Sequence, residues 1–213
     1  MDLQEIEAIC IDLALTNGKL LIEQWPNLQI DHVKNADEIC TNLDIQVEQN
    51  LLNTLQKKFP DHNFVAEESG VNQQQSAYTW YLDPIDRTTN YAKKLPFFSI
   101  SIALTNNDVP IFGLVYNPAT HELFYASQNQ GAKLLRTNFD HLYEQEFVEK
   151  LHVSEVTELS LSFLQLELPK RTTANKYHSA KKLDQLIKQA ERVRSLGSAA
   201  LSLCYTALGS FDG

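Results

Sequence analysis

Hydrophobic residues recur at helical spacing in two stretches near the N-terminus, residues 3–25 and 44–59. This spacing predicts two amphipathic helices, because side chains three and four positions apart share one helix face. The first helix is expected to weaken near Asn17 and Gly18 and to stop at Trp25 and Pro26. Residues 27–42 are polar and mixed, and residues 34–37 within them predict a loop.

Apolar and β-branched runs then predict strands, at residues 64–66, 78–82, 97–104, 109–116, 122–126 and 132–135. The run at 78–82 is expected to stop before Pro84, because proline has no backbone N–H. Residues 71–77 predict a surface loop, and residues 138–151 show no clean period. A strand at 159–166, a surface helix at 176–190 and an apolar helix at 197–208 complete a large sheet flanked by helices.

Composition narrows the class of protein. The 213 residues are 43% hydrophobic, enough for a core in one domain or in two packed lobes. A net charge of −9 argues against a nucleic-acid partner, because such binding rests on Lys and Arg contacts to phosphate. Three scattered cysteines indicate neither a zinc site nor a disulfide framework. No secretory signal and no run of transmembrane length occur, so we expect a cytoplasmic chain without a membrane partner.

Four acids follow two of the predicted strands. Glu67 and Glu68 come after residues 64–66, and Asp83 and Asp86 come after residues 78–82. Two unpaired carboxylates ~4 Å apart repel by ~4 kcal/mol at an effective dielectric constant of 20, so such a cluster needs a cation. A single acid would be an ordinary strand end in solvent. Four acids predict a site for Mg²⁺, which prefers carboxylate and phosphate oxygens.

These acids belong to motifs that resemble the inositol monophosphatase family, within the Mg-dependent, lithium-sensitive phosphomonoesterase superfamily. The motifs occupy residues 67–69, 83–90, 96–102 and 194–201. The resemblance covers nearly the whole chain and implies a layered α-β-α-β sandwich of the α/β (α+β) class. We expect an N-terminal lobe at 1–140 carrying the metal-site motifs and a C-terminal lobe at 141–213. The family's last acidic motif lies beyond Gly213, so the second lobe is expected to be incomplete.

The resemblance implies how a cation would be held. Two or three Mg²⁺ ions would bind Glu67, Asp83, Asp86 and the backbone carbonyl of Ile85. Glu68 would lie beside these ligands or bridge two ions. The family has Gly at the position of Ala66 in most members.

The resemblance also implies catalytic and substrate-binding roles. Thr88 would activate water and pass a proton towards Asp44, since Mg²⁺ lowers the pKa of bound water, and Glu67 is counted with them as catalytic. From the residues alone, Asp44 and Thr88 also fit helix caps, and the segment from Gly197 fits plain helix packing. The substrate would contact Asp86, Arg87, Thr88, Gly197, Ser198 and Ala199.

Arg87 departs from the family, which has Gly there. If the backbone φ angle is positive, a side chain costs about 1–2 kcal/mol of strain. If φ is negative, the guanidinium could reach the substrate phosphate.

The function expected from the resemblance is Mg-dependent hydrolysis of a small phosphorylated polyol, foremost myo-inositol monophosphate, by a homodimer. Fructose 1,6-bisphosphate and a nucleotide 3′-phosphate are alternative substrates. The chain has no nucleophile elbow and no P-loop, which argues against acyl transfer and nucleoside-triphosphate hydrolysis. The competing hypothesis is a catalytically silent or fragmentary family member that acts as a binding or regulatory module.

Overall fold

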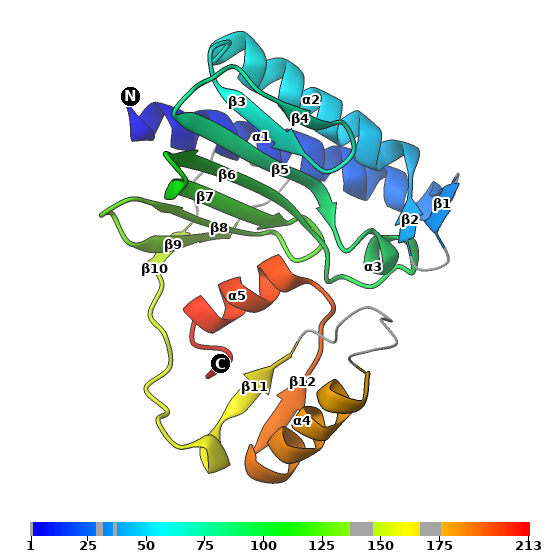
Figure 1. Ribbon diagram of the computed structural model, residues 1–213, viewed down its shortest axis with the longest axis vertical. Coiled ribbons are helices and arrows are strands. Elements are labelled where there is room, and N and C mark those ends of the chain that lie inside the picture. Colours follow the sequence, from blue (N-terminus) through cyan, green and yellow to red (C-terminus); the bar gives the residue numbers. More distant parts are fainter. Residues whose placement is uncertain (1, 29–31, 36–37, 137–146, 167–175) are drawn as a thin grey trace. The chain divides into compact units, whose positions relative to one another are not determined.

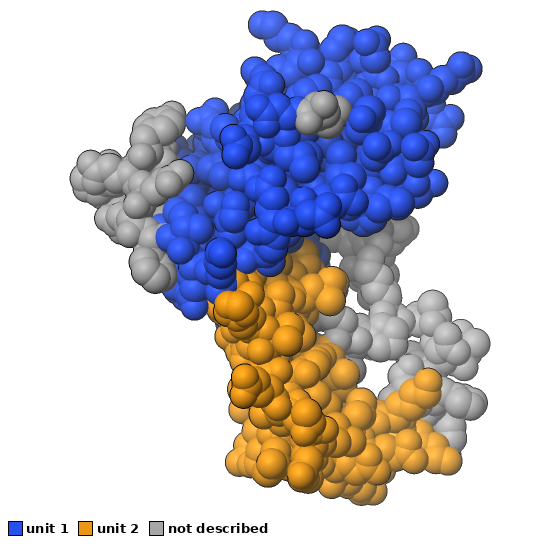
Figure 2. All heavy atoms as spheres, turned by 90° about the vertical axis from the view of Figure 1, so that its left-hand side faces the viewer, with its two compact units in different colours: residues 1–150 blue, residues 151–213 orange. Residues whose placement is uncertain are grey.

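A computed structural model describes residues 2–28, 32–35, 38–136, 147–166 and 176–213. The chain forms two compact units, Met1–Lys150 and Leu151–Gly213, coloured separately in Figure 2. The boundary predicted at residue 140 would put residues 147–150 in the second lobe, whereas they belong to the first unit. Within the described ranges, no helix has both the length and the apolar character needed to cross a membrane.

The first unit is built on an eight-stranded sheet with the order β10-β9-β8-β7-β6-β5-β3-β4 (Figure 1). Its neighbouring strands are antiparallel except β3 and β5, which run parallel. The meander predicted between residues 97 and 135 is confirmed. The strands are β3 (Asn63–Ala66), β4 (Gly70–Asn72), β5 (Tyr78–Asp86), β6 (Ser99–Asn106), β7 (Val109–Asn117), β8 (Glu122–Ser127), β9 (Ala132–Arg136) and β10 (Phe147–Lys150).

Two helices pack on one face of this sheet, α1 (Leu3–Gln24) and α2 (Asn42–Lys58). Alternate strand residues such as Trp80, Ile102 and Leu114 point into the shared core, as period-two patterning requires. A short 3₁₀ helix, Trp25–Asn27, follows α1 where the sequence predicts a stop.

Helix α1 runs unbroken through Asn17 and Gly18, so the predicted weakening there is wrong. The Asn17 side-chain amide donates to the Leu13 carbonyl at 2.8 Å. Gly18 lies against the ring of Tyr116: a Cβ atom built on Gly18 would be only 2.9 Å from Tyr116 Cδ1, and 3.0 Å from Pro118 Cβ. The glycine therefore permits a close approach of helix to sheet.

Strand β5 continues past Pro84 to Asp86, which the sequence analysis did not predict. Asp83 is paired with Ser101 and Asp86 with Ser99, so two residues of β5, Pro84 and Ile85, lie opposite a single residue of β6. Such a bulge lets a residue without an N–H pass through an antiparallel pair.

Two further short strand pairings lie where loops were expected. An antiparallel pair of short strands, β1 (His32–Asn35) and β2 (Glu38–Cys40), precedes α2. Strand β4 occupies the start of the predicted loop at 71–77 and pairs with β3.

The second unit contains a parallel pair of strands, β11 (Phe163–Gln165) and β12 (Arg192–Arg194). A 3₁₀ turn, Leu159–Leu161, shortens the strand predicted at 159–166. Helices α4 (Lys176–Gln189) and α5 (Ala199–Ala207) confirm the two helices predicted there. Most of the stretch without a clean period, 138–146, lies outside the described residues. The predicted mixed α/β class is confirmed.

Candidate active site

The first turn of α2 holds a buried carboxylate. Helix α2 begins at Asn42 with Thr41 as its N-cap, so the prediction of Asp44 as the N-cap is wrong by one turn. Asp44 instead completes a capping box: its Oδ2 atom accepts from Thr41 N at 2.7 Å and from Thr41 Oγ1 at 2.6 Å. Burial raises the pKa of Asp44, hydrogen bonds from Thr41 and Thr88 oppose this, and the charge of Glu68 raises it further.

Thr88 brings a hydroxyl to this carboxylate from a distant part of the chain. Its Oγ1 lies 2.8 Å from Asp44 Oδ1 and 3.1 Å from the Ile85 carbonyl oxygen. The hydroxyl has one proton, so when it donates to either oxygen its lone pairs remain able to accept. The predicted pairing of Thr88 with Asp44 is present in the structure.

Arg87 sets the backbone that presents Thr88. It precedes the short helix α3 (Thr88–Ala92) and has φ 69° and ψ 57°, the left-handed region. The positive-φ alternative of the sequence analysis is therefore the one observed, and the exposed arginine sits where a glycine would be unstrained.

The carboxylates gather because β3 and β5 are parallel. Ala66 is the register partner of Leu82, so Glu67 and Asp83 leave the paired segment together. The charges of Glu67 and Asp86 are close enough to raise the pKa of Asp83, and the Glu67 side chain is also hydrogen-bonded to Asp83. Three of the predicted ligands are thus in one place.

Asp83 has a strongly raised pKa within this cluster. Its Oδ1 atom is buried and has no hydrogen-bond partner. Burial raises the pKa of Asp83 from 3.8 to about 9, with further increases from the charges of Glu67 and Asp86. In this environment the negative charge is unfavourable, so the carboxylate binds a proton or another cation more readily than an exposed carboxylate does.

These groups fit Mg²⁺ by their chemistry: hard oxygen donors, mutual repulsion and one unsatisfied buried oxygen. In the described part of the chain, no group of three or more His, Cys, Asp or Glu side chains is already arranged to hold a metal ion. Asp83 and Glu67 are hydrogen-bonded to each other, and the Ile85 carbonyl is within reach of Thr88. Residues that could hold the cation are Glu67, Asp83, Asp86 and the Ile85 carbonyl.

Glu48 is a nearby residue that sequence reasoning missed. Its side chain is only 2% exposed, on the buried face of α2. Its two carboxylate oxygens accept from the backbone N–H groups of Glu68 at 2.7 Å and of Ser69 at 2.8 Å. The available signal was its spacing, four residues after Asp44, which places both acids on one helix face.

Three predicted substrate contacts lie in the second unit. Gly197 has φ 87°, and Ser198 caps α5 by accepting from Leu201 N at 3.1 Å. Ala199 is the first residue of α5. These positions fit a helix cap, and their contact with substrate stays a prediction.

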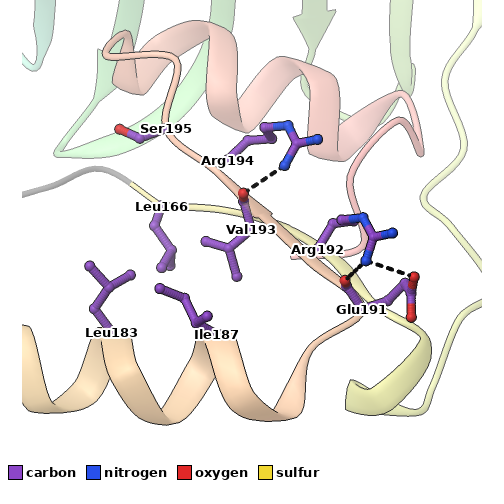
Figure 3. Close-up of a pocket in the computed structure, with 8 residues that line it drawn as sticks. All are labelled: Leu166, Leu183, Ile187, Glu191, Arg192, Val193, Arg194 and Ser195. Carbon is purple, nitrogen blue, oxygen red and sulfur yellow. Dashed lines mark hydrogen bonds and ion pairs between the residues drawn. The ribbon is translucent and has the colours of Figure 1, made fainter.

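The second unit also has a cavity of about 510 Å³ (Figure 3). Leu183 and Ile187 of α4 point towards Val193, and two arginines at the rim bond to local carbonyls. No residue of the predicted site lines this cavity.

Known proteins match this chain along its length. The profile of the inositol monophosphatase family matches residues 2–213. A Pasteurella multocida relative named Nus factor SuhB is 34% identical over 182 residues, which cover 85% of this chain and 64% of the relative. A Synechocystis relative named inositol-1-monophosphatase is 33% identical over 221 residues, which cover 100% of this chain and 70% of the relative.

Solved structures share the fold. The inositol monophosphatase of Anabaena superposes with a TM-score of 0.79 at 30% identity, covering 99% of this chain and 74% of that one. The SuhB protein of Bartonella henselae superposes with a TM-score of 0.83 at 26% identity, covering 97% and 76%. The chain thus spans about two thirds to three quarters of the length of these relatives. Profile, sequence relatives and fold agree, and the chain belongs to the inositol monophosphatase family.

Proposed function

We propose that this chain supplies the metal-binding half of a Mg²⁺-dependent phosphomonoesterase that acts on a small phosphorylated polyol. The observation that carries the proposal is the buried, unpaired Oδ1 of Asp83 between the charges of Glu67 and Asp86. A cation at this point would relieve the repulsion and satisfy the oxygen. Bound Mg²⁺ supplies charge neutralisation at the phosphate and a lowered pKa for a water molecule.

Thr88 and Asp44 provide the path for the proton of the attacking water. The Thr88 hydroxyl donates to Asp44 Oδ1 at 2.8 Å, which leaves its oxygen able to accept a proton from a water molecule in front of it. The raised pKa of Asp44 makes this carboxylate a better proton acceptor than an exposed one. Thr41 fixes the other carboxylate oxygen, so the Asp44 side chain cannot rotate away.

Substrate recognition is proposed for Asp86, Arg87 and Thr88, and for the start of α5 at 197–199. The name of the Synechocystis relative favours myo-inositol monophosphate as the substrate. Phosphoryl transfer depends mainly on positioning and on charge neutralisation, and an acidic cluster that gathers cations serves both.

The test is phosphate release from myo-inositol 1-phosphate by the purified chain, with and without Mg²⁺. Thr88→Ala should lower kcat by about 10²–10⁴-fold, the usual contribution of a proton-transfer group, with little change in KM. Thr89→Ala is the matched control, because Thr89 lies in the same helix turn. Equal losses in the two variants would mean that these threonines serve only the helix, and no Mg²⁺-dependent release from the wild-type chain would refute the activity.

A second candidate function is a binding module without turnover. Arg87 at a left-handed position departs from the family glycine, and the Pasteurella relative is named a Nus factor. This candidate predicts Mg²⁺ binding without phosphate release, so the same assay separates the two.

A further inference from the structure

Glu48 joins α2 to the turn that carries the acids of β3. Its two carboxylate oxygens accept the N–H groups of two successive residues, Glu68 and Ser69, at 2.7 and 2.8 Å. The side chain is 2% exposed and comes from the middle of the second turn of α2. Hydrogen bonds from N–H to a charged carboxylate at this length are among the stronger ones in proteins.

A negative charge at this position is costly for stability alone. Burying an ionised side chain carries a free-energy penalty that good hydrogen bonds must offset. Here the buried carboxylate is also close to Glu68, whose own charge already raises the pKa of Asp44. A turn that needed only satisfied N–H groups could use water, since Ser69 is exposed.

The position of Glu48 on α2 lets its buried carboxylate connect two parts of the carboxylate cluster. Asp44 lies one helical turn earlier on the same face and binds Thr88. Helix α2 therefore holds both sides of the carboxylate cluster: Thr88 through Asp44, and the turn after Glu67 through Glu48. The two sides, residues 67–69 and 83–88, lie just beyond the last paired residues of β3 and β5, Ala66 and Leu82, so the β3–β5 backbone ladder does not extend to them.

We propose that Glu48 is a positioning residue for the cation site, which fixes the Glu67–Glu68 turn relative to Thr88. The inference rests on the proposed function, because it assigns Glu48 a part in holding the Mg²⁺ ligands. Glu48 accepts from backbone N–H groups and is not one of the proposed ligands, so its effect on the cation would pass through Glu67 and Glu68.

The test compares Glu48→Gln with Val47→Ala. Glutamine keeps the size of the side chain but has one acceptor oxygen, so one of the two N–H groups loses its partner. Val47 is the adjacent, fully buried residue of α2, and its truncation weakens the core without touching the turn. Mg²⁺ affinity is read from the metal-dependent rise in melting temperature, and hydrogen exchange of the Glu68 and Ser69 amides is read without metal.

We expect Glu48→Gln to raise the Mg²⁺ concentration for half-maximal effect by 10–100-fold, as loss of an outer-sphere partner does. Exchange at Glu68 and Ser69 should also accelerate at least tenfold relative to Val47→Ala. In the wild-type chain these two amides should exchange at least tenfold more slowly than unprotected ones, a measurement that stands even if Glu48→Gln does not fold.

The outcomes separate the two proposals. A wild-type chain that responds to Mg²⁺, with Glu48→Gln and Val47→Ala equal in Mg²⁺ affinity, would overturn the role of Glu48 and leave the proposed function intact. Unprotected Glu68 and Ser69 amides in the wild-type chain would also overturn it. No Mg²⁺ response in the wild-type chain would overturn the proposed function, and with it the role of Glu48 towards the cation.

Discussion

Replacing Asp83 by Asn should make the metal-free chain more stable while removing its response to Mg²⁺. In the folded chain the pKa of Asp83 is about 9, against 3.8 for an ordinary aspartate. The folded state therefore binds a proton that the unfolded state releases above pH 4, and stability falls as the pH rises from about 4 to about 9. Asparagine has nearly the same shape and no charge to bury.

The size of the effect follows from the pH difference. At pH 7 the solution lies about 3 units above the ordinary pKa, and each unit corresponds to about 1.4 kcal/mol, so the penalty is at most about 4 kcal/mol. For a chain of this length, removing this penalty in Asp83→Asn corresponds to a rise in melting temperature of up to about 10 °C. The gain should become small at pH 4, where the solution lies close to the ordinary pKa of 3.8 and the unfolded aspartate is already partly protonated.

The assay is thermal unfolding in EDTA at pH 4, 7 and 9, repeated with Mg²⁺ at pH 7. The wild-type chain should gain about 2.7 kcal/mol at a Mg²⁺ concentration one hundred times the dissociation constant, and Asp83→Asn much less. Asp108→Asn is the control, because Asp108 is an exposed acid in the β6–β7 turn. A variant no more stable than wild type at pH 7, or one equally stabilised at pH 4 and pH 7, would refute the reasoning.

Three other substitutions test single features of the fold. Arg87→Gly should raise the free energy of unfolding by about 1 kcal/mol because it relieves a left-handed backbone, and urea unfolding that shows no gain would contradict the strain. Gly18→Ala should lower the free energy of unfolding by about 1–3 kcal/mol through the clash with Tyr116, unlike Ala substitution at exposed Lys19. His62 Nδ1 accepts a hydrogen bond from Trp80 Nε1 at 3.0 Å, and burial lowers the pKa of His62 from 6.5, so its contribution to stability should be full above pH 6.5, fall as the pH drops from 6.5 to the folded pKa, and level off below that. His62→Gln, which keeps an acceptor, should flatten that fall between pH 7 and 5; an unchanged slope would exclude His62 as its cause.

The meander could be predicted from the sequence, and the four acids could be singled out in it, because both depend on local pattern. Alternating apolar residues specify strands, and acids at strand ends need no partner to be recognised. The path of β5 past Pro84 could not be predicted in this way, because a bulge depends on the neighbouring strand, Ser99 to Ser101. Glu48 was missed for a similar reason: its partners are backbone N–H groups twenty residues away, and backbone groups leave no mark in a sequence.

The contact between Thr88 and Asp44 joins residues 44 positions apart, whereas the strands β6 to β9 pair through short turns. Closing a long loop costs more entropy than closing a hairpin, so local pairings form first and long-range ones later. We therefore expect the carboxylate cluster to assemble late in folding, after the meander has formed. We also expect the turns of this cluster to open without unfolding of the meander, because Glu67, Ser69 and Arg87 are exposed and segments with few buried apolar contacts open at lower free energy. A bound cation would oppose that local opening, and it would slow unfolding more than it would speed folding.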